Sequence, residues 1–243
     1  MKKLLNALLV LCLCLSLCQS VFAIEPDLEQ VPDFYDAARL DRIERLKADI
    51  EISLQALISP QADAPVVSSK TLNVPLYQQP NYPNYYCGPA CTQMALSYFG
   101  ISISQSTLAG SAYLNTDVDE GTYVYKIENV LNGFLGGQAY QSVLTTQIPF
   151  SVGMKYSIDK NLPVICHVHT SSLPNYNGYG CNHYVIVTGY FTVHGTQNGI
   201  GDVDQVYYND PHNNNNFFGQ YVCTYYEMTK AINDRAGFYI MGR

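Results

Sequence analysis

The sequence contains no tryptophan and few charged residues. Charged residues make up 14% of the 243 residues, only 13 are Lys or Arg, and the formal net charge is −7. Beyond a Lys-Lys pair at positions 2 and 3 the basic residues form no cluster, which argues against nucleic acid as a partner. Hydrophobic residues reach 47%, and a chain with this balance folds around a core rather than staying disordered. The composition predicts one sizeable globular domain with extensions.

Long apolar runs are lacking after the first 23 residues. Residues 1–23 begin with the Lys-Lys pair, continue with an apolar stretch over 4–17, and offer small residues for cleavage at 21–23. This pattern predicts a signal peptide, and the apolar stretch is too short for a membrane span. Cys18 fits a lipid anchor poorly because Leu17 precedes it. We therefore expect a secreted or cell-surface protein, bacterial in type, with no membrane span after signal removal.

Zinc-type C-x-x-C pairs are also missing. Of the 8 cysteines, three lie in the signal segment, which leaves five in the exported chain. An odd number in an exported protein indicates one thiol that stays free. The other four could form two disulfides or remain reduced and buried; they are Cys91, Cys166, Cys181 and Cys223.

Residues 24–58 form an amphipathic helical segment by pattern. Apolar residues recur every three or four positions, Asp33 is a candidate N-cap, and Asp41 and Arg45 make an i,i+4 pair. The helix is interpreted as packing on the domain, on a second copy or as a tether; the alternative is a pro-segment that covers a cleft. Residues 59–70 contain two prolines and no periodicity, and are predicted to be a linker. The apolar stripe consists of Leu40, Ile43, Leu46, Ile50, Leu54 and Leu57.

Residues 71–243 form the main domain, in which helical patterns come first and strand patterns later. This order predicts an α+β fold with an antiparallel sheet. The strongest strand is 184–190, which is β-branched and aromatic throughout. Helices are predicted from Cys87 to Gly100, from Ser104 or Ser106 to Ala112, from Gly121 to Phe134 and near 152–160; strands are predicted at 164–168, 184–190, 205–208 and 237–241.

The segment from Cys87 to Gly100 carries the first chemical signal. Pro89 suits a first helical turn and Gly100 a position just past a last one, so Cys87 lies at a helix N-terminus. The positive end of the helix dipole favours an anion there, and the thiolate is the nucleophilic form of cysteine. A buried structural cysteine before an ordinary helix is the alternative.

Three other positions could give Cys87 catalytic partners. His183 directly precedes the strongest strand, and Asp210 ends the next one, so the carboxylate could orient the imidazole. Gln79 lies eight positions before Cys87, where its amide could donate to an oxyanion. Gln78 directly precedes it and is the competing candidate.

The motifs Val74-Pro75 with Gln79, Cys87-Gly88-Pro89-Ala90, the run 183–190 and Asn209-Asp210-Pro211 together resemble the bacteriocin-processing cysteine peptidase family. The resemblance covers about 72–242. It implies a papain-like fold, with the nucleophile helix of the helical half packed on an antiparallel sheet. It also implies Cys87 as nucleophile, His183 as general base and acid, Asp210 as the residue that orients His183, and Gln79 as oxyanion donor.

The resemblance implies hydrolysis of a peptide-type bond through a thioester acyl-enzyme, without cofactor or metal. The expected partner is a peptide or protein substrate, including cell-wall peptide. Typical family members are fused to a transporter and this sequence is not, so cleavage of a double-glycine leader is not implied.

Two alternative interpretations remain. One is a catalytically silent binding module on the same fold, with a rim formed by Tyr82, Tyr85, Tyr86, Tyr176 and Tyr179. The other is a metal site at His167 and His169, for which a strand crossing a half-buried sheet is the favoured explanation. His194 and His212 are predicted to be exposed loop residues.

Overall fold

The computed structural model describes residues 36–57, 66–194 and 203–243. Its helices are α2 (Ala37–Leu57), α3 (Cys87–Tyr98), α4 (Gln105–Ala109), α5 (Thr116–Asp119), α6 (Val124–Leu135), α7 (Phe150–Asp159) and α8 (Tyr225–Arg235). Its strands are β1 (Val66–Thr71), β2 (Tyr140–Leu144), β3 (Val164–His169), β4 (Asn182–His194), β5 (Val203–Asp210), β6 (Gly219–Thr224) and β7 (Phe238–Gly242). The 3-10 turns η2 (Thr170–Ser172) and η3 (Pro174–Tyr176) connect β3 to β4. Within the ranges described, no helix has the length and apolar character that a membrane crossing requires.

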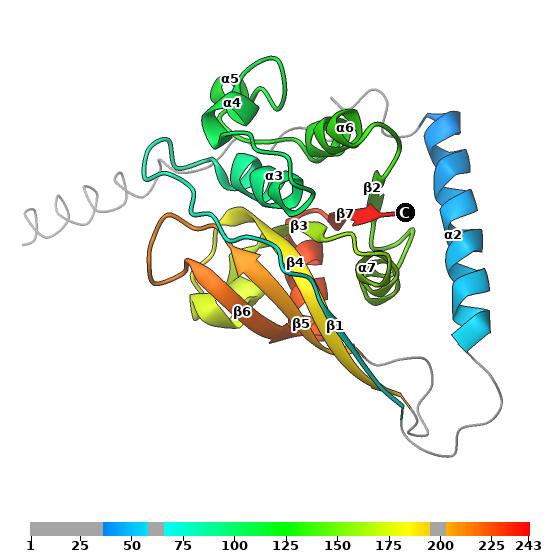
Figure 1. Cartoon of the computed structure of the whole chain (residues 1–243). Helices are drawn as coiled ribbons and strands as arrows, with labels where there is room; N and C mark the ends of the chain where they lie inside the picture. Colours follow the sequence, from blue (N-terminus) through cyan, green and yellow to red (C-terminus); the bar gives the residue numbers. More distant parts are fainter. Residues whose placement is uncertain (1–35, 58–65, 195–202) are drawn as a thin grey trace, which may run out of the picture. The chain divides into compact units, whose positions relative to one another are not determined.

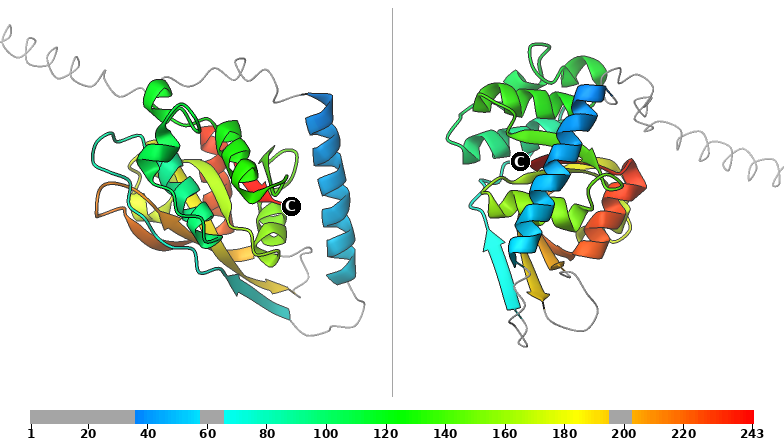
Figure 2. Two further views of the ribbon diagram at one scale, coloured as in Figure 1. Left: turned by 45° about the horizontal axis from the view of Figure 1, so that its top comes forward. Right: turned by 90° about the vertical axis from the view of Figure 1, so that its right-hand side faces the viewer.

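One antiparallel sheet organises the main domain, as the sequence predicts. Its strands follow the order β2-β7-β3-β4-β5-β6, and β1 also pairs with β4. The long strand β4 pairs with β3 over its first half and with β1 over its second half. Helices α3 to α6 gather on one side of the molecule, and the far ends of β1, β4 and β5 project on the other (Figures 1 and 2).

The predicted helices form close to the predicted positions, and local signals explain their ends. The hydroxyl of Ser104 caps α4 by accepting a hydrogen bond from the Thr107 backbone N–H. Gly136 ends α6 in the left-handed conformation that glycine adopts without strain. The sequence analysis missed α5, α8, β2 and β6. Helix α8 nevertheless begins with a capping box between Thr224 and Glu227, a signal that is readable in the sequence.

The linker prediction for 59–70 is wrong at its C-terminal end. Residues Val66–Thr71 form β1, with Val67 paired to Val193 and Lys70 to Tyr190. The run Val-Val-Ser-Ser-Lys-Thr has strand character only when β4 supplies a hydrogen-bonding edge. Residues 58–65 lie outside the described part of the chain.

Helix α2 packs on the main domain. Ile43, Leu46 and Ile50 are buried as the stripe predicts, whereas Leu40 is exposed. Asp36 caps the helix by accepting from the Arg39 backbone N–H, and the predicted cap Asp33 lies outside the described residues. The side chains of Leu54 and Leu57 also lie outside them.

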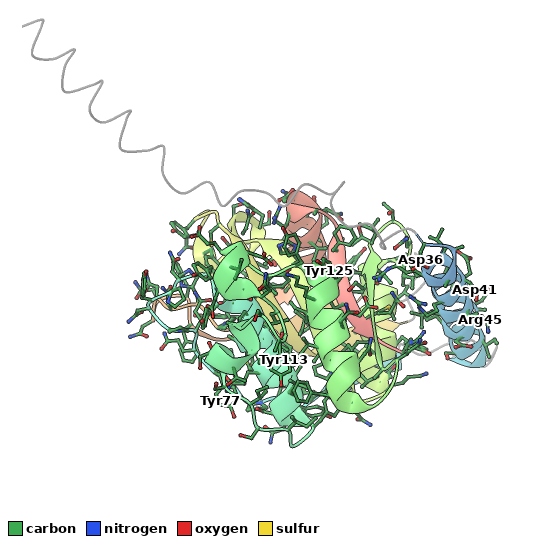
Figure 3. The ribbon with its side chains drawn as sticks, turned by 90° about the horizontal axis from the view of Figure 1, so that it is seen from above. Asp36, Asp41, Arg45, Tyr77, Tyr113 and Tyr125 are labelled. Atoms are coloured by element: carbon green, nitrogen blue, oxygen red, sulfur yellow. The ribbon has the colours of Figure 1, made fainter. Side chains whose placement is uncertain are left out.

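A buried ion pair fixes α2 to the domain. The Arg39 guanidinium donates to Glu128 on α6 at 2.8 Å and to the Ser142 carbonyl on β2 at 3.0 Å. The predicted Asp41–Arg45 pair also forms, at 2.9 Å on the exposed side of the helix (Figure 3). Since β7 and β3 separate β2 from β4 in the sheet, α2 docks at the edge remote from the strands that carry His183 and Asp210.

Candidate active site

His183 and Asp210 meet where two neighbouring strands end. His183 is the second residue of β4 and Asp210 the last of β5, and the two strands run antiparallel side by side. The ring Nε2 of His183 donates to Asp210 Oδ1 at 2.9 Å. The side chains are only 3% and 0% exposed, so the interaction is shielded from water and its electrostatic strength is high.

Four hydrogen bonds surround the Asp210 carboxylate. Besides His183, the backbone N–H of His212 donates to Oδ1 at 3.0 Å. The Tyr176 hydroxyl donates to Oδ2 at 2.8 Å and the Asn175 amide at 3.3 Å. The carboxylate is therefore fully satisfied and fixed in orientation, which in turn fixes the His183 ring.

Cys87 begins α3, as the sequence predicts. Helix α3 contacts β4, and Tyr86 before it makes no side-chain cap hydrogen bond, so the positive end of the helix lies at Cys87. Gly88 is required here because a Cβ would lie 2.4 Å from the Thr122 hydroxyl oxygen. Tyr184 holds this part of the chain by donating its hydroxyl to the Thr122 carbonyl at 2.7 Å.

Cys87 lies close enough to His183 to affect its titration. Burial lowers the pKa of His183, but the charge of Asp210 and the influence of the Asp210 and Cys87 side chains outweigh it and raise that pKa well above its usual value. Because Nε2 is bonded to Asp210, Nδ1 is the ring nitrogen that remains available for the thiol. The arrangement favours an imidazolium near Cys87, a residue that is partly exposed.

Gln79 and Gln78 occupy different environments. Gln79 is 4% exposed; its backbone N–H donates to Pro211 O at 2.7 Å and its side-chain amide to Asn84 O at 2.9 Å. Its Oε1 has no hydrogen-bond partner in the described part of the chain. The Gln78 amide instead binds the loop after β5, through the carbonyls of residues 212 and 213. Gln79 thus lies on the segment joined to the residue after Asp210, while Gln78 is used for loop structure.

An aromatic wall lies beside His183, and the sequence did not predict that its rings meet there. We define it as Tyr176, Tyr179, His212 and Phe217. Phe217 stacks on Tyr176, at 4.5 Å, and on Tyr179, at 5.5 Å between ring centroids, and the two tyrosine rings also face each other at 6.5 Å. The His212 ring lies 5.4 Å from His183 and edge-on to Phe217 at 5.1 Å. These residues belong to the loops after β3 and β5. No local sequence pattern predicts that these two loops approach each other.

One sequence prediction for this region is wrong. His212 is not a freely exposed loop residue: it is half-buried against the wall, and its Nδ1 accepts from the Asn214 N–H at 2.9 Å. Burial and the neighbouring His183 lower the pKa of His212 to about 4 despite the charge of Asp210. Of the predicted tyrosine rim, Tyr86 and Tyr176 are buried and hydrogen-bond to carboxylates, whereas Tyr82 and Tyr179 are exposed. The side chain of His194 lies outside the described residues.

The five cysteines of the main domain are all free thiols. Burial raises the pKa of Cys91, Cys166 and Cys223. Burial also raises the pKa of Cys181, which is partly exposed and close enough to His183 for that histidine to oppose the shift. The reduced and buried alternative of the sequence analysis applies to three of the four cysteines other than Cys87.

The two histidines of β3 have partners of their own. His167 is stacked on Tyr184 at 4.4 Å, and its Nε2 accepts from Arg235 at 3.1 Å. His169 pairs with the Ser171 hydroxyl at 2.8 Å. Over residues 36–57, 66–194 and 203–243, no three His, Cys, Asp or Glu side chains gather in a way that could hold a metal ion.

Comparison with known proteins identifies the class of molecule. Residues 71–233 match the model of the Peptidase_C39 like family. A protein from Bacillus anthracis described as a C39-like peptidase shares the fold with a TM-score of 0.50 and 17% identity, over 72% of this chain and 98% of its own. The match extends over more than half of the sequence, so the chain belongs to the Peptidase_C39 like family. It is a cysteine-type peptidase with a papain-like fold, as the sequence resemblance implies.

Two further solved structures are similar at a lower level. One is a double glycine motif protease from an AMS/PCAT transporter in complex with the leader peptide, with a TM-score of 0.43 and 14% identity over 71% of this chain and 93% of its own. The other is the peptidase domain of Streptococcus ComA, a bi-functional ABC transporter involved in a quorum sensing pathway, with a TM-score of 0.41 and 18% identity over 70% and 98%. No curated protein matches the sequence.

Proposed function

We propose that this peptidase hydrolyses a peptide-type bond with Cys87 as nucleophile, His183 as general base and acid, and Asp210 as the residue that orients His183. The observation that carries the proposal is the buried pair of His183 and Asp210, 2.9 Å apart, with Cys87 close enough to raise the pKa of His183. A nucleophile next to a base that a third group orients is the arrangement of nucleophilic catalysis.

The reaction proceeds in two steps. The Cys87 thiolate attacks the substrate carbonyl, and His183 gives its proton to the departing amine, which leaves a thioester acyl-enzyme. Water, deprotonated by His183, then attacks the thioester, and the C–S bond breaks to release the acid and the thiolate.

The oxyanion is stabilised by the Cys87 backbone N–H and by the Gln79 amide. The Gln79 NH2 group has two donors and Asn84 uses one, which supports Gln79 over Gln78 for this role. Removing one such donor costs about 3–4 kcal/mol of barrier.

The proposed substrate is a peptide or protein, including cell-wall peptide, met outside the cytoplasm after residues 1–23 direct export. Residues 24–58 serve as a docked tether, and the catalytic domain is 71–243 with β1 added at its start. This proposal rests on the signal pattern, on the docking of α2 at the β2 edge, and on the peptidase family.

The competing function is a catalytically silent binding module at the cell surface. The buried state of two of its five rim tyrosines argues against it. Iodoacetamide footprinting of the purified chain near pH 6 separates the two, because burial raises the pKa of the other four thiols, whereas Cys87 is partly exposed and lies near His183. We expect Cys87 to be labelled first, its labelling to weaken in His183→Ala, and peptidase activity to vanish in Cys87→Ala and His183→Ala. Preferential labelling of Cys181, or an active His183→Ala protein, would contradict the proposal.

A further inference from the structure

The departing amine of the substrate must leave from beside His183. His183 supplies its proton, so the residue after the scissile bond, P1′, lies next to this ring and away from the acyl group on Cys87. One ring nitrogen of His183 is bonded to Asp210, and Cys87 is close enough to affect the titration of the ring. The surface that continues outward from the ring is the aromatic wall, through His212 at 5.4 Å.

The wall leads from the buried pair to the solvent. Tyr176 is 1% exposed, Phe217 is half-buried, and Tyr179 is 55% exposed. Phe217 stacks on both tyrosines with interplanar angles of 23° and 19°, and the two tyrosine rings face each other at 12°. The outer end of the wall is thus an accessible aromatic surface that is continuous with the catalytic histidine.

The wall is rigid before any ligand binds. Tyr176 is fixed by its hydrogen bond to Asp210, and Thr170 accepts and donates hydrogen bonds that hold residues 179 and 181. Gly178, at φ +84°, makes the turn that returns Tyr179 over Phe217. A preformed aromatic surface loses little side-chain entropy on binding.

The wall carries no formal charge near neutral pH. Its only titratable group in that range is His212, whose pKa of about 4 keeps the ring neutral. The charged and titratable groups that face it are His183 and Asp210, which neutralise each other in their own pair. An uncharged aromatic surface favours an apolar or aromatic ligand over a charged one.

We propose that the outer end of the aromatic wall, formed by Tyr179 and Phe217, is the P1′ subsite and selects substrates with an aromatic or large apolar residue directly after the scissile bond. The inference rests on the proposed function and adds a substrate class to it. By microscopic reversibility, an amine that attacks the acyl-enzyme occupies the same subsite. Its nitrogen forms the new amide bond, the C–S bond to Cys87 breaks, and the amine proton passes to His183.

Acyl-enzyme trapping tests this subsite without knowledge of the natural substrate. The full chain is acylated with the p-nitrophenyl ester of N-benzyloxycarbonyl-glycine, and phenylalanine amide and glycine amide compete with water for the acyl group. We expect phenylalanine amide to trap the acyl group about three- to tenfold better than glycine amide, the range that one aromatic contact gives.

Variants connect the preference to the wall. Tyr179→Ala should lower the ratio by about threefold or more, whereas Tyr179→Phe, which retains the ring, should keep it. Tyr226→Ala is the matched control: Tyr226 is also exposed, at 71%, but follows the end of β6 opposite to Phe217. A ratio near one in the wild type, or an unchanged ratio in Tyr179→Ala, overturns the subsite while leaving the proposed function intact. Release of p-nitrophenol no faster than in Cys87→Ala overturns the proposed function and the subsite together.

Discussion

Asp210→Asn changes one oxygen of a fully buried carboxylate into an NH2 group. The groups around Asp210 determine how much unfolding free energy the change costs. With the amide oxygen at the Oδ1 position, the hydrogen bonds from His183 and His212 persist. The NH2 group then faces the amide of Asn175, donor to donor, while the Tyr176 hydroxyl can turn to accept. The main loss is one charge-assisted interaction, about 1.5–3 kcal/mol of unfolding free energy.

The same change moves the titration of His183. In the wild type, the charge of Asp210 raises the pKa of His183 against the effect of burial. Asn removes the charge and leaves the burial, so the pKa falls. Because the folded pKa lies above the unfolded value of about 6.5, His183 contributes stability that is fully present below pH 6.5 and lost as pH rises through the folded pKa. That contribution disappears in Asp210→Asn.

The value of kcat/KM should depend on the fraction of the enzyme in which His183 is protonated. The alkaline limb of kcat/KM against pH should move to lower pH, and the maximum should fall about 10- to 100-fold, equivalent to about 1.4–2.7 kcal/mol of barrier. Asp210→Ala should lose more than Asp210→Asn because it also loses the orientation of the ring, and His183→Ala should lose most. The ester assay at closely spaced pH values and urea unfolding measure both effects. An alkaline limb that stays in place, or moves to higher pH, would refute the reasoning.

Three further perturbations have defined outcomes. Gly88→Ala should displace Thr122 and lower kcat/KM by about tenfold or more in the ester assay, whereas Gly133→Ala, whose Cβ meets nothing within 4 Å, should be tolerated; equal activities would contradict the steric argument. Arg39→Ala should lower the unfolding free energy measured in urea by about 3–5 kcal/mol, because it leaves a buried carboxylate without its ion-pair partner. The control Arg45→Ala, in a pair that is 77% and 59% exposed, should lower it by less than about 0.5 kcal/mol. Similar losses in the two variants would contradict the stabilising role of the buried ion pair. EDTA should leave ester cleavage unchanged, and chelator-sensitive turnover would reopen the metal interpretation.

Local patterns are sufficient to predict much of this fold. The β-branched and aromatic run in β4 can form only a buried strand, and Gly136 and Ser104 define helix ends by their own backbone chemistry. The order of Gln79, Cys87, His183 and Asp210 along the chain was readable because each lies next to a recognisable element. The structure pairs His183 with Asp210, places Cys87 near His183, and joins the Gln79 segment to Pro211.

Local sequence patterns do not predict the interactions between segments that lie far apart in the chain. Arg39 looks like a surface residue of an amphipathic helix, yet it is buried because Glu128 meets it from 89 positions away. Strand β1 exists because β4 is long enough to offer a second edge. His212 and Phe217 belong to a loop that reads as polar, and only its position against Tyr176 makes it part of the site.

The difference in exposure within the site has a consequence for chemical intervention. His183 is 3% exposed and Asp210 is not exposed at all, whereas Cys87 is partly exposed. A reagent in solution can therefore reach the proposed nucleophile more easily than the proposed base. Small thiol-reactive electrophiles should inactivate the native enzyme. Reagents that modify imidazole should react with His183 only after the structure around it unfolds. Inhibitors of this protein should therefore carry an electrophilic group that reacts with the Cys87 thiol.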